Sequence, residues 1–389
     1  MKLAVPQHAI QPYISIGIIA WNEQEAIVPM LNSLLAQTVF VELAKRGLGC
    51  ELFCIANGCT DRTAAVASDI FERQARESSQ REVLSCEVVE LAERGKLKAW
   101  NQFVHRLSHR EARFLFLMDA DIILHHKATL QNMLVALEQD KDVHVVTDSP
   151  RKQLSFKSPQ SLTDKLSLRA SEITTASSAQ LCAQLYAIRS EIARNIYLPK
   201  DLTACEDGFI KHLVCTNFLT TKALPERIFQ VPEAEHTFEA YTSPFAIFKN
   251  QKRQIIGQTI VHLLIDKYLP SLAMEQRHEL AVSLKELDRS DSGWLKRLIR
   301  QHLKQIRFFW KLYPDLLTHR IKLVWRLKGY QRLKCLPVAM ASSLVTFIAC
   351  WMAYRTLKGG RFDYWPPPQR LGLNNLNTQS AEQKLVSIN

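Results

Sequence analysis

Short, uninterrupted apolar runs alternate with amphipathic segments through roughly the first 150 residues of the chain. The runs at 14–20, 52–56 and 114–118 read ISIGIIA, LFCIA and FLFLM. A strand buried on both faces of a parallel sheet is a continuous apolar run, whereas a strand with one solvated face alternates apolar and polar residues. The pattern therefore predicts an α/β fold class with a doubly wound, mainly parallel sheet.

The same rules predict the remaining elements. Asn22 is expected to cap a helix, with Glu25 completing a capping box, and Thr60 or Asp61 to cap the helix after the second strand. Further strands are expected at 86–91, at 144–147, within 178–188 and at 228–231. Further helices are expected at 96–107, 130–137 and 207–213, and the chain is expected to be helical from Phe245 onward.

Charge is concentrated in one part of the chain. The net charge of the 389 residues is +12, and the stretch 294–334 holds twelve Lys or Arg and a single acid, Asp315. Twelve minus one leaves eleven, so the rest of the chain is nearly neutral. A nucleic-acid channel through the N-terminal part is therefore not expected, and no nucleic-acid partner is predicted. A basic stretch beside an apolar segment favours an anionic membrane surface instead.

Cysteine usage indicates a reducing compartment. The nine cysteines are odd in number and irregularly spaced, and no CxxC occurs. Neither a disulfide framework nor a zinc site is supported by this pattern. The first fifteen residues lack an apolar run of signal-peptide length, so the first domain is expected to be cytoplasmic.

Polar residues follow each predicted strand at the end where α/β sheets bind ligands. The segments that are expected to meet at this edge are Ala20-Trp21-Asn22-Glu23, Asn57-Gly58-Cys59-Thr60-Asp61, Gly95-Lys96 with Asn101, and Asp119-Ala120-Asp121.

Asp119 and Asp121 directly follow the very apolar run FLFLM. Two carboxylates two residues apart can face one cation, and their hard oxygens suit Mg²⁺ or Mn²⁺. Such an ion would neutralise a departing diphosphate. The alternative is a solvated loop with two acids.

A second acidic pair, Glu206-Asp207, precedes a predicted helix. It would supply a general base for an acceptor hydroxyl, or it would merely cap the helix and complement its dipole. His236, after the last predicted strand, is a lone histidine, for which a structural or solvated role is the alternative to the metal-ligand role that the family resemblance described below implies.

Taken together, these residues resemble the inverting family-2 glycosyltransferases with the GT-A fold. The resemblance covers residues 13 to 257, and the order of the motifs is what makes it specific. The matching segments are Ile19-Ala20-Trp21-Asn22-Glu23, Ala56-Asn57-Gly58-Cys59-Thr60-Asp61-Arg62-Thr63, Gly95-Lys96-x-x-Ala99-x-Asn101, Asp119-x-Asp121 and Glu206-Asp207.

The resemblance implies a role for each motif. Asp207, with Glu206 beside it, would be the catalytic base of a single inverting displacement. The metal ligands would be Asp119, Asp121 (the closer one) and His236, holding Mn²⁺ or Mg²⁺. The nucleotide of the donor would lie against Ala20, Asn22, Glu23, Asn57, Lys96 and Asp119.

Two positions depart from the family pattern. Asn57 stands where many members have Asp, and an amide both donates and accepts, so the preferred base is left open. Processive members carry Q-x-x-R-W, but this chain has Gln251 and Arg253 without the Trp, which favours a single addition. Arg253 would contact a phosphate or be one more cation on a basic helix face.

The C-terminal third has the composition of a membrane-binding region. Residues 294–310 combine an apolar face, which includes Trp294 and Trp310, with a Lys/Arg face. This pattern is typical of a helix in the headgroup layer, and the alternative is packing on the catalytic domain. Residues 336–354 carry no charge and either span the bilayer or lie in its interface, with the basic N-terminal flank cytoplasmic.

The expected organisation is a catalytic domain at 1–245, a basic helical region at 246–335, the apolar helix at 336–354 and a poorly ordered tail at 355–389. The expected activity is transfer of one sugar, a hexosyl unit, from a nucleoside-diphosphate sugar to a lipid-linked or cell-envelope glycan. The competing readings are a nucleotidyltransferase, which would need a Gly-rich loop after the first strand that is missing here, and an inactive membrane adaptor.

Overall fold

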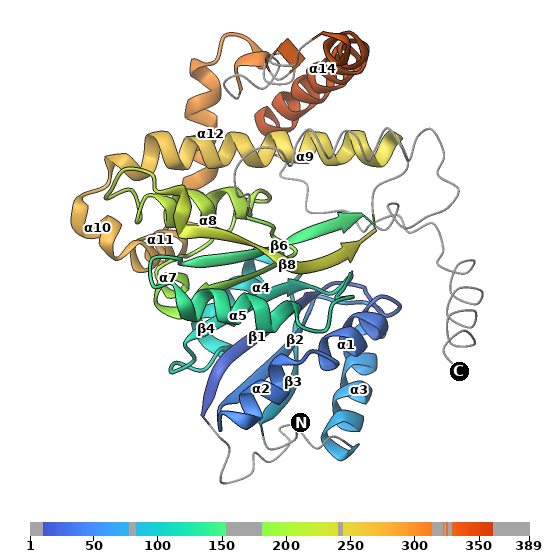
Figure 1. The fold of residues 1–389 in the computed structure, drawn as a ribbon. Coiled ribbons are helices and arrows are strands. Elements are labelled where there is room, and N and C mark those ends of the chain that lie inside the picture. Colours follow the sequence, from blue (N-terminus) through green and yellow to red (C-terminus); the bar gives the residue numbers. More distant parts are fainter. Residues whose placement is uncertain are drawn as a thin grey trace.

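The computed structural model describes residues 11–77, 83–152, 181–239, 244–312, 322, 324, 325 and 329–360. Within these residues the chain forms one mixed sheet of eight strands in the order β3-β2-β1-β4-β7-β6-β8-β5. Helices cover both faces of the sheet, and a further helical layer is built on the long helix α9 (Figure 1).

The strands are β1 (Pro12–Ala20), β2 (Gly49–Asn57), β3 (Leu84–Leu91), β4 (Phe114–Asp119), β5 (Ile122–Ile123), β6 (Val145–Lys152), β7 (Leu185–Arg189) and β8 (Ile228–Phe238). The helices between the strands are α1 (Ile27–Leu35), α2 (Val39–Lys45), α3 (Thr63–Glu77), α4 (Lys96–Gln102) continued by the π-helix η1 (Phe103–Leu107), α5 (Thr129–Gln139), α7 (Ser190–Arg194), α8 (Glu206–Cys215) and the short 3₁₀-helix η3 (Pro225–Arg227). The C-terminal helices are α9 (Pro244–Leu263), η4 (Leu264–Tyr268), η5 (Leu269–Ser271), α10 (Met274–His278), α11 (Leu280–Ser290), α12 (Trp294–Gln305), η6 (Phe309–Lys311) and α14 (Tyr330–Lys358).

The predicted fold class is confirmed, and the sheet is parallel where the apolar runs are longest. β1 pairs in parallel with both β2 and β4, and β2 with β3. The second half is mixed, because β7 runs antiparallel to both β4 and β6 while β6 and β8 are parallel.

Two cores, one on each face of the sheet, explain why the apolar runs are continuous. Ile16 of β1 packs in the core that contains the helices α1, α2 and α5, whereas Ile19 belongs to the core on the face covered by α4, α8 and α9. The second face leaves no room for a side chain at Gly17, because a Cβ there would lie 2.7 Å from the ring of Phe103.

The expected helix cap at Asn22 is wrong. Asn22 has a φ of 54°, and α1 begins only at Ile27, preceded by Ala26. The Asn22 side chain bonds to the loop after β2 instead of to its own helix, so tertiary contacts override the capping pattern. Thr60 or Asp61 was predicted to cap the helix after the second strand, which is α3. Asp61 is the residue that does so, because it accepts a hydrogen bond from the Thr63 amide at 3.0 Å.

Within the 294–310 segment, for which a headgroup position was predicted, the part that forms α12 packs on protein, as the alternative prediction requires. The apolar face of α12, including Trp294, Leu295 and Ile299, is buried in the core that contains α9. A Trp- and Leu-rich face beside basic residues has the same pattern whether it meets lipid or protein, so periodicity alone does not separate the two.

α14 contains the whole predicted 336–354 segment and packs along α9. Gln251 of α9 donates a hydrogen bond to Thr346 of α14 at 2.6 Å. The predicted boundary at residue 245 falls in the first turn of α9, and α14 runs on to Lys358. The remainder of the predicted tail, from residue 361, lies outside the described residues.

By length and composition, one described stretch, Ile27–Lys45, is apolar enough to cross a membrane. In the structure it is divided into α1 and α2, whose buried residues Leu31, Leu34 and Phe40 pack in the sheet core. A buried core helix passes the same test of composition, so this stretch gives no independent support for a membrane span.

Candidate active site

The loops after β1 and β2 are joined by hydrogen bonds into one rim. The Oδ1 atom of Asn22 accepts a hydrogen bond from the Thr60 amide at 2.8 Å. The next amide, that of Glu23, donates to the Thr63 hydroxyl at 2.8 Å. The Gln24 amide then donates to the Asp61 carboxylate at 3.1 Å. The predicted nucleotide-binding segments 20–23 and 57–61 are therefore held together.

The loop after β3 is fixed to the same rim. The buried side chain of Asn57 accepts a hydrogen bond from the Gly95 amide at 2.9 Å, which positions the start of α4. Gly58, with a φ of 65°, lies so close to the loop after β3 that a Cβ at this position would be 2.6 Å from the backbone nitrogen of Arg94. Asn57, which was predicted to contact the nucleotide, therefore also has a structural role, because its side chain holds the loop before α4.

Trp21 and Arg94 form a contact that the sequence did not reveal. The Arg94 guanidinium lies 3.3 Å from the centroid of the Trp21 ring, so the loop after β1 and the loop after β3 are in contact at this point of the rim. Trp21 lies within a predicted motif and Arg94 directly precedes another, but a cation–π pair joins positions far apart in the chain and leaves no local pattern.

Lys96 connects the two acidic motifs. Its Nζ lies 2.8 Å from Asp119 Oδ1 and 3.2 Å from Glu206 Oε1, so the end of β4 and the start of α8 share one ammonium group. Asp119, Lys96 and Glu206 therefore converge although they are distant in sequence. Asp207 is the next residue along, in the first turn of α8.

The turn before α8 has an unusual backbone. Thr203 and Cys205 both have positive φ angles, of 64° and 62°. The Cys205 thiol lies 3.0 Å from the side-chain oxygen of Gln254 on α9, and a Cβ at Gly257 would be 2.8 Å from Ala204. Non-glycine residues in this region are strained and persist only where their surroundings hold them. Here α9 holds the turn that carries Glu206 and Asp207.

Arg253, the predicted phosphate contact, lies on α9 beside this turn. Its charge acts on Glu206 and Asp207, lowering the pKa of each. The helix face of Arg253 is therefore turned to the acidic motif rather than being part of an isolated basic stripe.

Burial controls the protonation of the acids. It raises the pKa of Asp119 to about 6 despite the nearby Lys96, and it raises the pKa of Asp121 as well. Burial, together with the charge of Glu206, also raises the pKa of Asp207 to about 6. Burial alone would raise the pKa of Glu206 too, but Lys96 and Arg253 overcome it and hold that pKa below its usual value.

His236 is buried on β8 and is bound to a residue that the sequence did not single out. Its Nδ1 lies 2.6 Å from the carboxylate of Asp148, which is also fully buried. Its Nε2 lies 3.4 Å from the side-chain oxygen of Gln184. Asp148 directly follows the predicted strand 144–147, and a polar residue at a strand end is the signal that could have found it. His236 also acts electrostatically on Asp121, opposing the burial that raises the pKa of that carboxyl.

The residues fit a divalent cation, although no cluster of three or more metal-binding side chains is preformed in the described part of the chain. Four carboxyl groups, those of the two acidic motifs, face the two cations Lys96 and Arg253. Burial, with the charges of Asp121 and Glu206, keeps the pKa of Asp119 raised even beside Lys96. Carboxylate oxygens are the ligands that Mg²⁺ and Mn²⁺ prefer.

Comparisons with known proteins agree with this architecture. The sequence profile of glycosyl transferase family 2 matches residues 15–189. A solved structure of the mannosyltransferase PcManGT from Pyrobaculum calidifontis, in complex with GDP-Man and Mn²⁺, is similar over 90% of this chain and 87% of that chain, with a TM-score of 0.50 and 15% identity. At that identity the likeness establishes a shared fold. No curated protein matches the sequence.

Two further structures have lower TM-scores. Glucosyl-3-phosphoglycerate synthase from Mycobacterium tuberculosis, in complex with Mn²⁺, UDP-glucose and phosphoglyceric acid, covers 63% of this chain and 78% of its own, with a TM-score of 0.41 and 15% identity. The S. aureus protein TarS (residues 1–349) covers 91% and 93%, with a TM-score of 0.42 and 14% identity.

Replacing Lys96 tests whether its ammonium group holds the two acidic motifs together. We expect Lys96→Ala to lower the free energy of unfolding by about 3 kcal/mol, because it leaves buried carboxylates without their shared cation. Lys98→Ala, in the same helix as Lys96, removes an exposed ion pair with Glu93 (2.7 Å) and should have a much smaller effect. The measurement is urea denaturation in EDTA. Equal effects of the two substitutions would contradict the role given to Lys96.

Proposed function

We propose that this chain, which carries a glycosyltransferase family 2 domain with the GT-A fold, moves one sugar from a nucleoside-diphosphate sugar to an acceptor hydroxyl with inversion at the anomeric carbon. The observation that carries the proposal is the convergence of Asp119, Lys96 and Glu206 at the ligand-binding edge of the sheet, with Asp207 beside them. Acidic groups from two distant segments meet where this fold class binds its ligands.

The nucleotide of the donor would bind along the rim formed by the loops after β1, β2 and β3. The hydrogen bonds that join Asn22 to Thr60 and Asn57 to Gly95 support a preorganised surface there. Ala20 and Glu23 lie in the same rim, at the end of β1 and directly after it. Preorganised groups bind a ligand at a lower cost in ordering than flexible ones.

The diphosphate would lie between Asp119, Asp121, Lys96 and Arg253. A Mn²⁺ or Mg²⁺ ion held by the two aspartates, with His236 as third ligand, would supply positive charge for the leaving diphosphate. Lys96, in contact with Asp119, and Arg253, near Glu206 and Asp207, would bind phosphate oxygens directly.

Asp207 would act as the general base, with Glu206 kept ionised beside it by Lys96. The acceptor hydroxyl gives its proton to Asp207 as its oxygen forms a bond to the anomeric carbon. The bond from that carbon to the diphosphate oxygen breaks at the same time, and its electron pair leaves with the nucleoside diphosphate. A pKa of about 6 leaves Asp207 ionised at neutral pH yet basic enough to take the proton.

The rival readings are weaker. A nucleotidyltransferase would need backbone amides of a Gly-rich loop after β1, and this turn reads Trp21-Asn22-Glu23. An inactive adaptor would not need buried carboxylates in excess over their cations, which cost stability.

A thermal-shift panel tests the donor and the cation together. We expect one nucleoside diphosphate and its sugar derivative to stabilise the protein, by about 2.7 kcal/mol at a hundredfold excess over Kd, and only with Mn²⁺ present. Asp121→Asn should remove the dependence on Mn²⁺, whereas Asp69→Asn, an exposed acid of α3, should not. Stabilisation that is the same in EDTA, or that no nucleotide produces, would contradict the proposal.

Asp207→Asn tests the base. We expect kcat to fall 10²- to 10⁴-fold, because an amide does not accept the proton. In the unaltered protein kcat/KM should fall as the pH drops below about 6, where Asp207 becomes protonated, and should be flat above it. Glu191→Gln, an exposed acid in the first turn of α7, serves as the control. An Asp207→Asn variant that keeps most of its activity would reassign the base.

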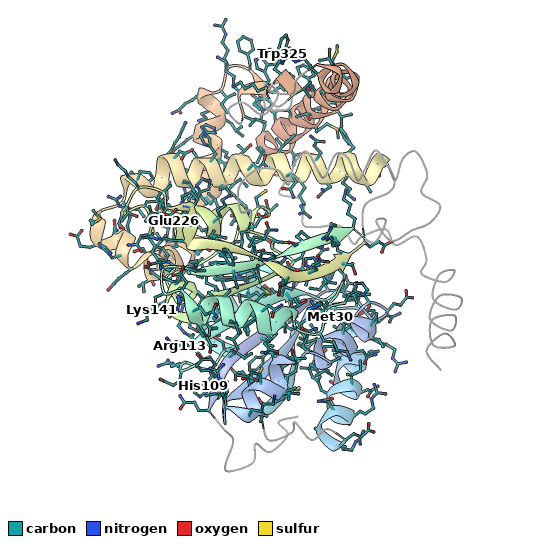
Figure 2. All side chains as sticks on the ribbon, viewed as in Figure 1. Met30, His109, Arg113, Lys141, Glu226 and Trp325 are labelled. Carbon is teal, nitrogen blue, oxygen red and sulfur yellow. The ribbon has the colours of Figure 1, made fainter. Side chains whose placement is uncertain are left out.

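A membrane-borne acceptor is the second part of the proposal, and an exposed aromatic surface supports it. This surface consists of Phe308, Trp310, Met340, Leu344, Phe347, Ile348 and Trp351, all exposed. Trp310 stacks on Phe308 and lies near Phe347, with ring centroids 4.7 and 6.3 Å apart, so η6 and α14 contribute to one patch. Trp325, 61% exposed, lies at the same end of the molecule (Figure 2).

Cations lie over the exposed rings. Arg307 is 5.4 Å from the centroid of Phe308, and Arg355 is 5.2 Å from that of Trp351. At Trp325 the neighbouring cation is Arg332, at 5.0 Å. Aromatic rings flanked by Arg and Lys suit the headgroup layer, where the rings reach the acyl boundary and the cations meet anionic phosphates.

An interfacial arrangement explains α14 better than a span does. Thr346, Ala349, Cys350 and Ala353 form a buried face of α14 against α9 and its neighbours. A helix with one face fixed to a soluble domain would lie flat on the bilayer with the opposite face inserted. The enzyme would then act on the cytoplasmic side of the membrane, on a lipid-linked or cell-envelope glycan.

Vesicle flotation tests this surface. The protein should float with vesicles that contain anionic lipid, less so at high salt, and carbonate at pH 11 should release it because it does not span. Trp310→Glu combined with Trp351→Glu should reduce binding at least tenfold. Phe229→Ser, an exposed aromatic on β8, should leave binding unchanged. Resistance to carbonate would indicate a span, and binding by the double variant would contradict the surface.

A further inference from the structure

Asp148 and His236 form a fully buried pair beside the acidic edge of the sheet. The two side chains are 0% exposed, and Asp148 Oδ2 lies 2.6 Å from His236 Nδ1. Asp148 stands where the pairing of β6 with β8 shifts register, between Thr147 and Ser149. Such irregularities re-aim a side chain out of the regular alternation, and here the carboxylate is turned toward the neighbouring strand.

The pair determines which ring nitrogen of His236 is available. Because Nδ1 faces a carboxylate, it carries the proton and donates it. Nε2 then has the lone pair, which requires the Gln184 amide to present its nitrogen rather than its oxygen to the ring. Nε2 lies 3.4 Å from the side chain of Gln184, whose backbone oxygen accepts the Asp119 amide at 2.9 Å. Gln184 therefore contacts both His236 and the end of β4 that carries Asp119, and the charge of His236 acts on Asp121.

A purely structural role explains the Asp148 carboxylate poorly. In the described part of the chain, its Oδ1 is buried without a hydrogen-bond partner, so His236 is the group that the carboxylate serves. A buried carboxylate with an unsatisfied oxygen costs stability, and an apolar residue of similar size would fill the space at lower cost.

We propose that Asp148 is a positioning residue that fixes the ring of His236 with Nε2 directed to the cation bound by Asp119 and Asp121. The inference rests on the proposed function, in which a divalent cation binds at those two aspartates. A carboxylate behind a metal-binding histidine sets its tautomer and raises its basicity, and losing such a partner typically weakens metal affinity 10- to 100-fold.

The test measures the affinity for Mn²⁺ by electron paramagnetic resonance of the free ion, without nucleotide. Asp148→Asn should weaken Mn²⁺ binding 10- to 100-fold. His236→Gln should weaken it to a similar degree, and the double variant should be no weaker than His236→Gln alone, because Asp148 acts through His236.

Glu51→Gln is the matched control for loss of a buried carboxylate. Glu51 lies in the same sheet, bonded to Ser15 and to the His109 amide, so its replacement should lower stability but leave Mn²⁺ affinity unchanged. Melting in EDTA reports whether each variant is folded, and the His236→Gln result decides the matter if Asp148→Asn does not fold.

Three results would overturn the inference. The first is that folded Asp148→Asn binds Mn²⁺ with an affinity within twofold of that of the unaltered protein. The second is that His236→Gln leaves the Mn²⁺ affinity unchanged. The third is that the losses of affinity in the two single variants add up in the double variant. If the unaltered protein binds no Mn²⁺, the cation of the proposed function fails together with this inference, whereas normal affinity in Asp148→Asn alone leaves that function intact.

Discussion

The ion pairs of Lys96 hold the two halves of the site in one place. Asp119 ends a central strand and Glu206 begins a helix from a different part of the chain, and the Lys96 ammonium lies between them at 2.8 and 3.2 Å. Charges removed from water are tolerated only when they are paired with good geometry. The pairing therefore fixes α8 to the sheet edge, and Asp207 takes its position from it.

The position of Lys96 depends in turn on the loop before it. Asn57 holds the Gly95 amide, and Gly58 allows the Arg94 backbone to pass at a distance that a side chain would block. From the other side α9 supports the strained turn at Cys205, and Gly257 permits that close approach. α9 also carries Gln251, which bonds to α14, so a single helix contacts both the turn before α8 and the helix with the exposed aromatic surface.

Much of the fold followed from sequence because burial on two faces leaves an unmistakable apolar run. The runs at 14–20 and 114–118 both became central parallel strands. The misses have physical reasons. The capping pattern at Asn22 was overridden by hydrogen bonds to Thr60, and the apolar face of α12 met protein where lipid would give the same periodicity. Contacts across the sheet, such as that of Asp148 with His236, leave no local trace.

The protonation of the acidic groups supports the proposed cation. Asp119 and Asp207 have pKa values of about 6, above the 3.8 of a free aspartate. A carboxyl whose pKa is raised in the folded state binds protons more tightly there than in the unfolded chain, so each contributes less to stability as the pH rises from about 4 through 6. At neutral pH both are ionised at a cost to folding. Positive charge near Asp119 relieves that cost, whereas Asp207, bonded to the Gly208 amide, keeps the basicity that proton transfer needs. The same burial thus favours positive charge beside Asp119 and leaves Asp207 with the basicity that the proposed proton transfer requires.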